Sequence, residues 1–333
     1  MNIKKFTSNS AFFIFFWIAY FLLSIFFYKE RATYADNSFY LFEIIQTKTF
    51  HFEHHRYSAF FIQWLTVLFV KLNFPLKLVM LAQSVNIGIY LLASFLVVIY
   101  LADEVWQKYI YLICSVAVIH HVFFLIASEL YLGINLLLLL CSVFVTNKIK
   151  ESNKYIWITV IAILIMLSHQ FILLIAVLVS GLFFLKKRDK FSFSTVFLFL
   201  FFIVIKHFLI HDKHDGNALS GMAFNQITLR RIHSGFFAKY FIKNLLNGYY
   251  VLPIILNIFF LIKIKTNKIY KVSALLLLAA VYILLTVFFK SETFLAYFDS
   301  YLSVFLVFSW LIVFLIIKDT DVKNSNILRI AVM

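Results

Sequence analysis

The sequence predicts an all-α polytopic membrane protein with about ten transmembrane spans. The composition is 63% hydrophobic and 20% aromatic with only 14% charged residues, which lies far outside the range of soluble domains. Apolar runs long enough to cross a bilayer recur along the chain, and short basic clusters separate them. The longer polar segments mix aromatic residues with charges and do not resemble a soluble domain. We therefore expect residues 1–333 to form a single integral membrane domain.

The first apolar run, 11–28, is long enough to cross a hydrocarbon core of roughly 30 Å, and we expect it to be a retained first span. Comparable runs predict further spans at 76–101, 109–127, 129–146, 191–209, 249–262, 272–289 and 300–317. Cys114 and Cys141 lie inside two of these runs, where a cysteine usually serves packing.

One longer apolar run needs to be divided. As a single helix, residues 155–185 would rise about 46 Å, which is too long for one straight span. The polar triplet Ser168-His169-Gln170 interrupts the run. We therefore predict two short spans joined by a tight hairpin.

The distribution of basic residues decides whether segment 58–72 is a short span or a helix at the membrane surface. The basic clusters lie at Lys4 and Lys5 and within 148–154, 186–190, 263–271 and 318–329. All of them become cytoplasmic, as the positive-inside rule favours, only if 58–72 does not cross. We therefore predict an interfacial or re-entrant helix there, with both termini cytoplasmic.

This topology also predicts on which side of the membrane the polar segments lie. Segments 29–75 and 210–245 become the main polar surface on the outer face, which we expect to hold the active site. Richness in Phe, Ile, Lys and Asn suits an AT-rich bacterial genome, so the predicted location is a bacterial inner (plasma) membrane. The formal charge of +15 is then a topology signal, and no nucleic-acid partner is expected.

The first outer segment offers Asp36 as a general base, because aromatic neighbours at a membrane boundary would desolvate its carboxylate. Glu43 follows seven residues later and would share its helix face. The alternative is that these acids are solvated or pair with Lys48 and Arg56. A weaker possibility is a divalent metal: His51, His54 and His55 have the spacing i, i+3, i+4, which places ligands on one face of a helix.

The second outer segment carries more cations than the positive-inside rule favours on that side. Anionic lipid head groups would explain them, and so would a phosphate or diphosphate ligand. Arg230 and Arg231 form an adjacent pair suited to bidentate contacts with phosphate oxygens. Glu129 at the outer mouth of one span and His169 at the hairpin are further candidates, with a solvated span end and a polar turn as their respective alternatives.

The order of these features resembles the GT-C superfamily of polyprenyl-phosphate-dependent membrane glycosyltransferases. A first span precedes an acidic outer loop, ADNSFYLFEII, and paired spans follow. The segment VIHHVFFLIASELYLGINLLLLLCSVF places Glu129 at a recurrent outer acid, and MLSHQFILL is similar to a short hairpin of the family. In FLAYFDSYLSVFLVFSW, Ser300-Tyr301 stands where many relatives have Arg-Tyr.

This resemblance implies a polyprenyl-phosphate sugar donor, with Asp36 as the base that activates an acceptor hydroxyl in an inverting displacement. The absence of a large outer domain favours a lipid or glycan acceptor in cell-envelope polysaccharide biosynthesis. The resemblance implies no definite cofactor, and a divalent metal stays open. The candidate residues for substrate or donor binding are Glu43, His54, His55, Arg56, Glu129, His169, Arg230 and Arg231.

Two other functions remain open. A lipid-linked polysaccharide polymerase or ligase would centre its chemistry on 211–245 and leave Asp36 dispensable. A transporter or flippase would place ionisable groups near mid-membrane and often shows repeated halves. The predicted spans are almost free of charge at their centres, and the chain has no evident internal repeat, so we rank this function last.

Overall fold

The computed structural model describes residues 3–34, 36–103, 107–108, 111–112, 123–124, 126–209 and 239. Within these ranges the chain is all-helical and contains no strand. The helices are α1 (Ile3–Phe26), α2 (Tyr28–Thr33), α3 (Asp36–Thr47), η1 (Tyr57–Ala59), α4 (Phe60–Lys71), α5 (Leu76–Leu101), α7 (Glu129–Val145), α8 (Glu151–Met166), α9 (Gln170–Lys187) and α10 (Lys190–Leu209). Most of the predicted span 109–127 and the last three predicted spans lie outside the described residues.

Helix positions agree closely with the apolar runs. Helix α5 has the predicted limits, and α7 and α10 each differ from prediction by one residue. The run 155–185 is divided as expected, because α8 ends at Met166 and α9 begins at Gln170. Helix α1 extends the first run backwards to Ile3.

Among the described helices, Leu76–Leu101 is the one long and apolar enough to cross a membrane. Shorter apolar helices cover Phe12–Phe26, Tyr57–Lys71, Tyr131–Val145 and Ile172–Gly181. One such helix weakly suggests association with a membrane. The ten-span topology stays a prediction.

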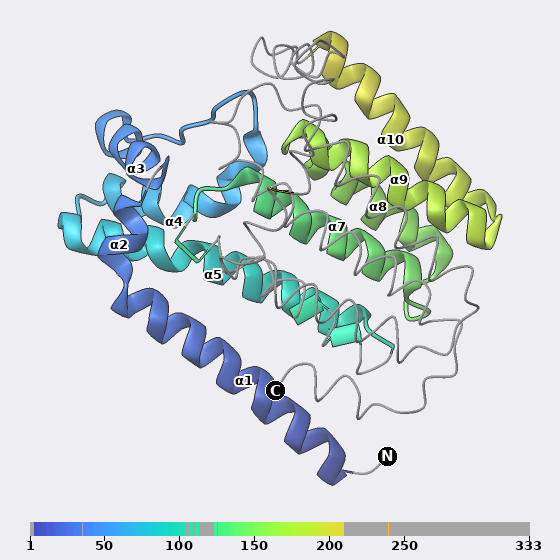
Figure 1. The fold of residues 1–333 in the computed structure, drawn as a ribbon, viewed down its shortest axis with the longest axis horizontal. Coiled ribbons are helices and arrows are strands. Elements are labelled where there is room, and N and C mark those ends of the chain that lie inside the picture. The colour runs from blue at the N-terminus through green and yellow to red at the C-terminus, as the bar shows by residue number, and fades with distance from the viewer. Residues whose placement is uncertain are drawn as a thin grey trace.

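The long helices lie side by side across the molecule (Figure 1). Helices α1, α5 and α7 follow one another across this view, and α8, α9 and α10 pack beyond α7. The main core is almost wholly aliphatic and aromatic, with Leu91, Leu132, Phe144 and Ala162 each fully buried. This apolar contact fixes the relative positions of the helices that carry the candidate site.

Three shorter helices gather where α1 ends and α5 begins (Figure 1). Helix α4 turns back along the first half of α5, and α3 packs against it. A separate small core holds this group together and includes Leu41 and Ile44 of α3, Val67 of α4 and Val79 of α5. The buried residues of α3, Asn37, Tyr40, Leu41 and Ile44, recur three and four positions apart, so one face of the helix is buried and the other stays exposed.

Candidate functional site

A buried carboxylate, Glu129, lies at the centre of a polar cluster formed by segment 29–75 and the start of α7. Glu129, the first residue of α7, is 8% exposed. The Tyr40 hydroxyl donates a hydrogen bond to its Oε1, and Nη1 of Arg56 lies 3.4 Å from its Oε2. An ionised carboxylate is costly to bury unless it is paired and hydrogen-bonded. Tyr40 and Arg56 provide both contacts.

Two further carboxylates surround His51 next to this group. Nδ1 of His51 lies 3.9 Å from Oε2 of Glu43, and its Nε2 lies 3.9 Å from Oε1 of Glu53. The Tyr40 hydroxyl is 3.4 Å from Oε2 of Glu53, which joins His51 and its carboxylates to Glu129. Three carboxylates, one arginine and one histidine therefore share a single half-buried site.

The backbone of His51 is fixed by α4. The side-chain amide of Gln63 accepts a hydrogen bond from His51 N at 3.0 Å and donates one to His51 O at 2.7 Å. These two hydrogen bonds fix the backbone of His51 within an irregular segment. They explain how a loop can present His51 to Glu43 and Glu53 in a defined position.

The environment of Tyr40 strongly favours its neutral form. Burial raises the pKa of the Tyr40 phenol above its usual value, and the negative charge of Glu129 and its hydrogen bond raise it further. The phenol therefore stays protonated and acts as a hydrogen-bond donor to the carboxylate. Its role is to position Glu129.

Asn37 connects the start of α3 to the segment that precedes α7. Its side-chain amide, fully buried, donates to Arg31 O at 2.6 Å and to Phe124 O. The amide oxygen accepts a hydrogen bond from Ala127 N at 3.0 Å. Asn37 is adjacent to Asp36, and Ala127 lies two residues before Glu129, so this one side chain sets the spacing between the two acids.

Asp36 itself is the first residue of α3, and its side chain is exposed. Residues four and seven positions apart lie on the same face of a helix. Asp36 therefore shares a face with Tyr40 and Glu43, as the sequence predicted for Glu43. Glu43 contacts His51 across this face, whereas Lys48 contacts Asn73.

The α8–α9 hairpin contacts segment 29–75 at the same end of the helices. Ser58 N donates to Leu167 O at 3.1 Å, two residues beyond Arg56. His169 is half-buried in this hairpin. Nζ of Lys206, near the end of α10, bonds to Met166 O at 3.0 Å and also to Ser168 O. These contacts bring Arg56, His169 and Lys206 to one region of the molecule.

The histidine triplet does not form the helical face on which the metal hypothesis depended. Residues 48–56 form a loop, in which His54 and His55 have positive φ angles of 52° and 56°. Nδ1 of His55 lies 3.2 Å from the Tyr57 hydroxyl, while the ring of His51 faces glutamates. Over the part of the chain that the structure describes, no group of three metal-ligating side chains could hold an ion.

Several predicted residues come together and others lie beyond the described part. Glu43, Arg56 and Glu129 belong to one cluster, and Arg230 and Arg231 lie outside the described residues. Sequence reasoning missed the role of Asn37 and treated Tyr40 only as an apolar neighbour. The i+4 spacing of Tyr40 from Asp36 was a signal that Tyr40 lies on the same helix face. The hydrogen bonds of Asn37 had no such signal, because they depend on Phe124 and Ala127, which are distant in sequence.

Comparison of the chain with protein-family models, with curated proteins and with solved structures gave no match in any of the three.

Proposed function

We propose that this chain is a membrane glycosyltransferase that moves a sugar from a polyprenyl-phosphate donor to a lipid or glycan acceptor. The observation that supports it best is that two different carboxylates lie on segments joined by Tyr40 and Asn37. Glu129 is buried and held by Tyr40 and Arg56, while Asp36 is exposed at the start of α3.

These two acids suit different roles in an inverting displacement. The oxygen of an acceptor hydroxyl attacks the anomeric carbon, the bond from that carbon to the phosphate oxygen breaks, and a base takes the hydroxyl proton. Asp36 is accessible and is our candidate for the base. Glu129 already has a donor on each oxygen, so we assign it to organising Arg56 and the surrounding loop.

The donor phosphate is expected to meet cations. Arg56 is engaged with Glu129 and Lys206 with backbone carbonyls, which leaves Arg230 and Arg231 as our candidates for phosphate contact. Both would lie on the outer face under the proposed topology of about ten spans with cytoplasmic termini. That topology, and a place in a bacterial inner membrane, form part of the same proposal.

The deciding experiment compares surface glycans of cells that carry the wild-type gene, a deletion, Asp36→Asn or Arg230→Ala. Both variants should lose the glycan that the deletion loses, although both still insert into the membrane. Glu151→Gln is the matched control, because Glu151 is an exposed acid at the start of α8. This control should leave the glycan unchanged.

A normal glycan profile with Asp36→Asn would contradict the assigned base. If Arg230→Ala alone then abolished the glycan, the chemistry would belong to 211–245, as a polymerase or ligase requires. If neither variant changed the glycan that the deletion loses, the transporter or flippase hypothesis would gain.

A further inference from the structure

The end of the molecule opposite the candidate site brings together the ends of α5, α7 and α9 and the starts of α8 and α10 (Figure 1). Asn147 N donates a hydrogen bond to Oδ2 of Asp103 at 2.8 Å, which joins the segments that follow α7 and α5. The ring of Phe191, in α10, lies 5.6 Å from the ring of Phe144, in α7, and 4.9 Å from that of Tyr155, in α8. These contacts bring the helix ends to one surface.

Basic residues outnumber acids among the described residues of this surface, which we call the basic end. Its cations are Lys108, Lys148, Lys150, Lys154, Lys187, Arg188 and Lys190, and its acids are Asp103, Glu151 and Asp189. Asp103 and Asp189 already accept hydrogen bonds from backbone N–H groups. Lys150, Arg188 and Lys190 are exposed, and none of the ion pairs in the described part of the chain involves them.

Three of the lysines hold the helix ends in place. Lys148, Lys154 and Lys187 each donate a hydrogen bond from Nζ to a backbone carbonyl where α5 or α7 ends. Lys148 reaches Ala102 O at 2.6 Å, and Lys187 reaches Phe144 O at 2.8 Å. Cations are favoured at the C-terminus of a helix, where the helix dipole is negative. The basic end is therefore a built feature of the fold.

Two cations of the basic end lie close enough to repel each other. Burial lowers the pKa of the Lys108 ammonium, and the positive charge of Lys148 lowers it further. An anion near both side chains would replace this repulsion by attraction. The charge at this end therefore favours an anionic partner.

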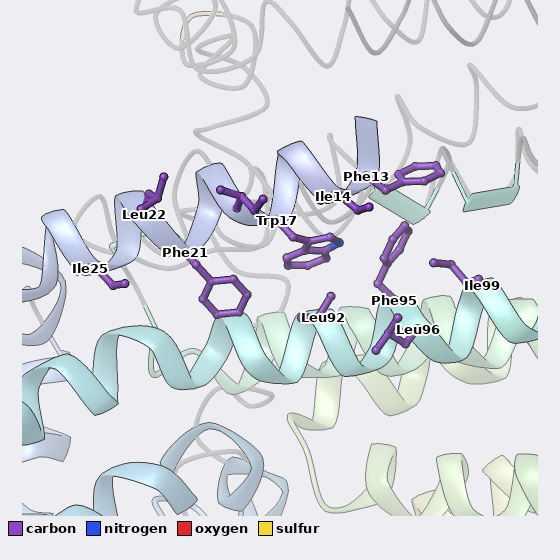
Figure 2. A pocket seen from close by; sticks show the side chains of 11 residues that line it. Phe13, Ile14, Trp17, Phe21, Leu22, Ile25, Leu92, Phe95, Leu96 and Ile99 are labelled. Carbon is purple, nitrogen blue, oxygen red and sulfur yellow. The ribbon is translucent and has the colours of Figure 1, made fainter. Parts of the chain in front are cut away.

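Exposed aromatic and then apolar side chains follow the cations along two helices. Tyr100 on α5 and Tyr155 on α8 are 64% and 40% exposed. About one turn further from the basic end, Leu96 on α5 (Figure 2) and Val160 on α8 are 55% and 49% exposed. Tyrosines between charged and apolar residues are typical of a membrane–water interface. This order favours a lipid surface over a nucleic acid or an acidic protein, because neither of these would require exposed apolar side chains beyond the tyrosines.

We propose that the basic end binds the phosphate groups of anionic phospholipids, with Lys150, Arg188 and Lys190 as the contacting cations. Lysine and arginine donate charge-assisted hydrogen bonds to phosphate oxygens. The positive-inside rule predicts that this end is cytoplasmic, and the cytoplasmic leaflet carries a negative surface potential. The proposal does not depend on the proposed enzyme activity, which concerns the opposite end.

Thermal unfolding of the full chain in detergent micelles tests the proposal. The probes are phosphatidylglycerol, which is anionic, and phosphatidylcholine with the same acyl chains, which is zwitterionic. A lipid that binds the folded chain raises its unfolding temperature, so we expect a larger and saturable rise with phosphatidylglycerol. Each cation near an anionic lipid surface contributes about fivefold to affinity. The triple variant Lys150→Gln/Arg188→Gln/Lys190→Gln should therefore raise the half-saturating phosphatidylglycerol concentration about one hundredfold.

The matched control is Lys29→Gln/Lys71→Gln/Lys77→Gln, which removes three exposed cations at the opposite end and should leave the titration unchanged. Equal titrations of the two triple variants would overturn the proposal. So would an equal rise with both lipids in wild type, or a rise that does not weaken with added salt, because exposed charges are screened. These wild-type results decide even if a variant does not fold. A rise with inorganic phosphate as large as that with phosphatidylglycerol would also overturn the proposal and assign the cations to a soluble anion.

Discussion

The hydroxyl of Tyr40 donates a hydrogen bond to the carboxylate of Glu129, joining two residues 89 positions apart. Both side chains are almost fully buried. The contact joins α3 to the start of α7. Two parts of the candidate site are thereby held together by one hydroxyl group.

Removal of that hydroxyl should destabilise the protein. Tyr40→Phe leaves the buried Glu129 carboxylate with one donor fewer, and a hydrogen bond to a charged group contributes about 1.5–3 kcal/mol. Denaturant unfolding in detergent measures the loss. Tyr34→Phe is the control, since Tyr34 is 50% exposed and should change stability by less than about 0.5 kcal/mol. Equal effects of the two substitutions would contradict the role assigned to the hydrogen bond.

Alkaline pH should expose the raised pKa of Tyr40. Burial and the nearby Glu129 charge raise the pKa of the folded phenol, whereas an unfolded tyrosine ionises near about 10. Below that pH both states keep the proton and the stabilisation is complete; above it the unfolded state alone loses the proton, so stability falls. The unfolding free energy should therefore fall more steeply above about pH 10 in wild type than in Tyr40→Phe. Parallel pH profiles would argue against a buried, neutral phenol.

The pair between Arg56 and Glu129 should show positive coupling in a double-mutant cycle. The side chains are each 10% exposed, so solvent screens their attraction only weakly, and removal of one partner leaves the other buried and uncompensated. We expect Arg56→Gln and Glu129→Gln each to lower the unfolding free energy more than the same substitution in an exposed ion pair would. The coupling energy from unfolding measurements should be about 1–3 kcal/mol. Additive effects would show that the two groups act independently.

Asn37→Ala should be among the most destabilising polar substitutions. It leaves Arg31 O, Phe124 O and Ala127 N without their present partner, and each unsatisfied buried group costs about 1–3 kcal/mol. A loss of about 3 kcal/mol or more in the unfolding free energy is expected. Asn153→Ala changes an exposed asparagine on α8 and should have little effect.

If Asn37 sets the spacing of Asp36 and Glu129, a substitution there should lower activity as well as stability. A folded Asn37→Asp protein should have reduced glycan transfer even where its unfolding midpoint is near wild type. An unchanged transfer rate in such a protein would limit Asn37 to a role in stability.

Gly88→Ala and Gly181→Ala should change stability in opposite directions. At Gly88 a new methyl group meets the rings of Tyr20 and Phe21, and overpacking of this kind costs about 1–3 kcal/mol. At Gly181 nothing lies within 4 Å of the added Cβ, and replacing a helical glycine by alanine contributes about 0.5–1 kcal/mol. Thermal unfolding of both variants checks the pair. A stabilised Gly88→Ala protein would mean that α1 does not pack on α5 as the structure has it.

Part of the fold could be predicted because the signal is local. Apolar runs and polar breaks indicated α5, α7, α10 and the division between α8 and α9, since each depends on a continuous stretch of side chains facing apolar surroundings. The sequence predicted Glu43, Arg56 and Glu129 for one site; the structure brings their side chains into one cluster, and their role in a site stays a prediction. Membrane topology and the identity of the reaction stay predictions from charge and resemblance.

Tertiary structure decided the arrangement of the candidate site. No periodicity in the sequence indicates that Tyr40 meets Glu129, that Asn37 bonds to Phe124 and Ala127, or that α1 crosses α5 at Gly88. Such contacts join segments that are distant along the chain, and they form only once apolar burial has fixed the helices in place. The amino-acid sequence by itself determined which segments are helical and which residues can carry charge; packing determined which of those charges meet, because a buried carboxylate is stable only where the fold brings donors to it.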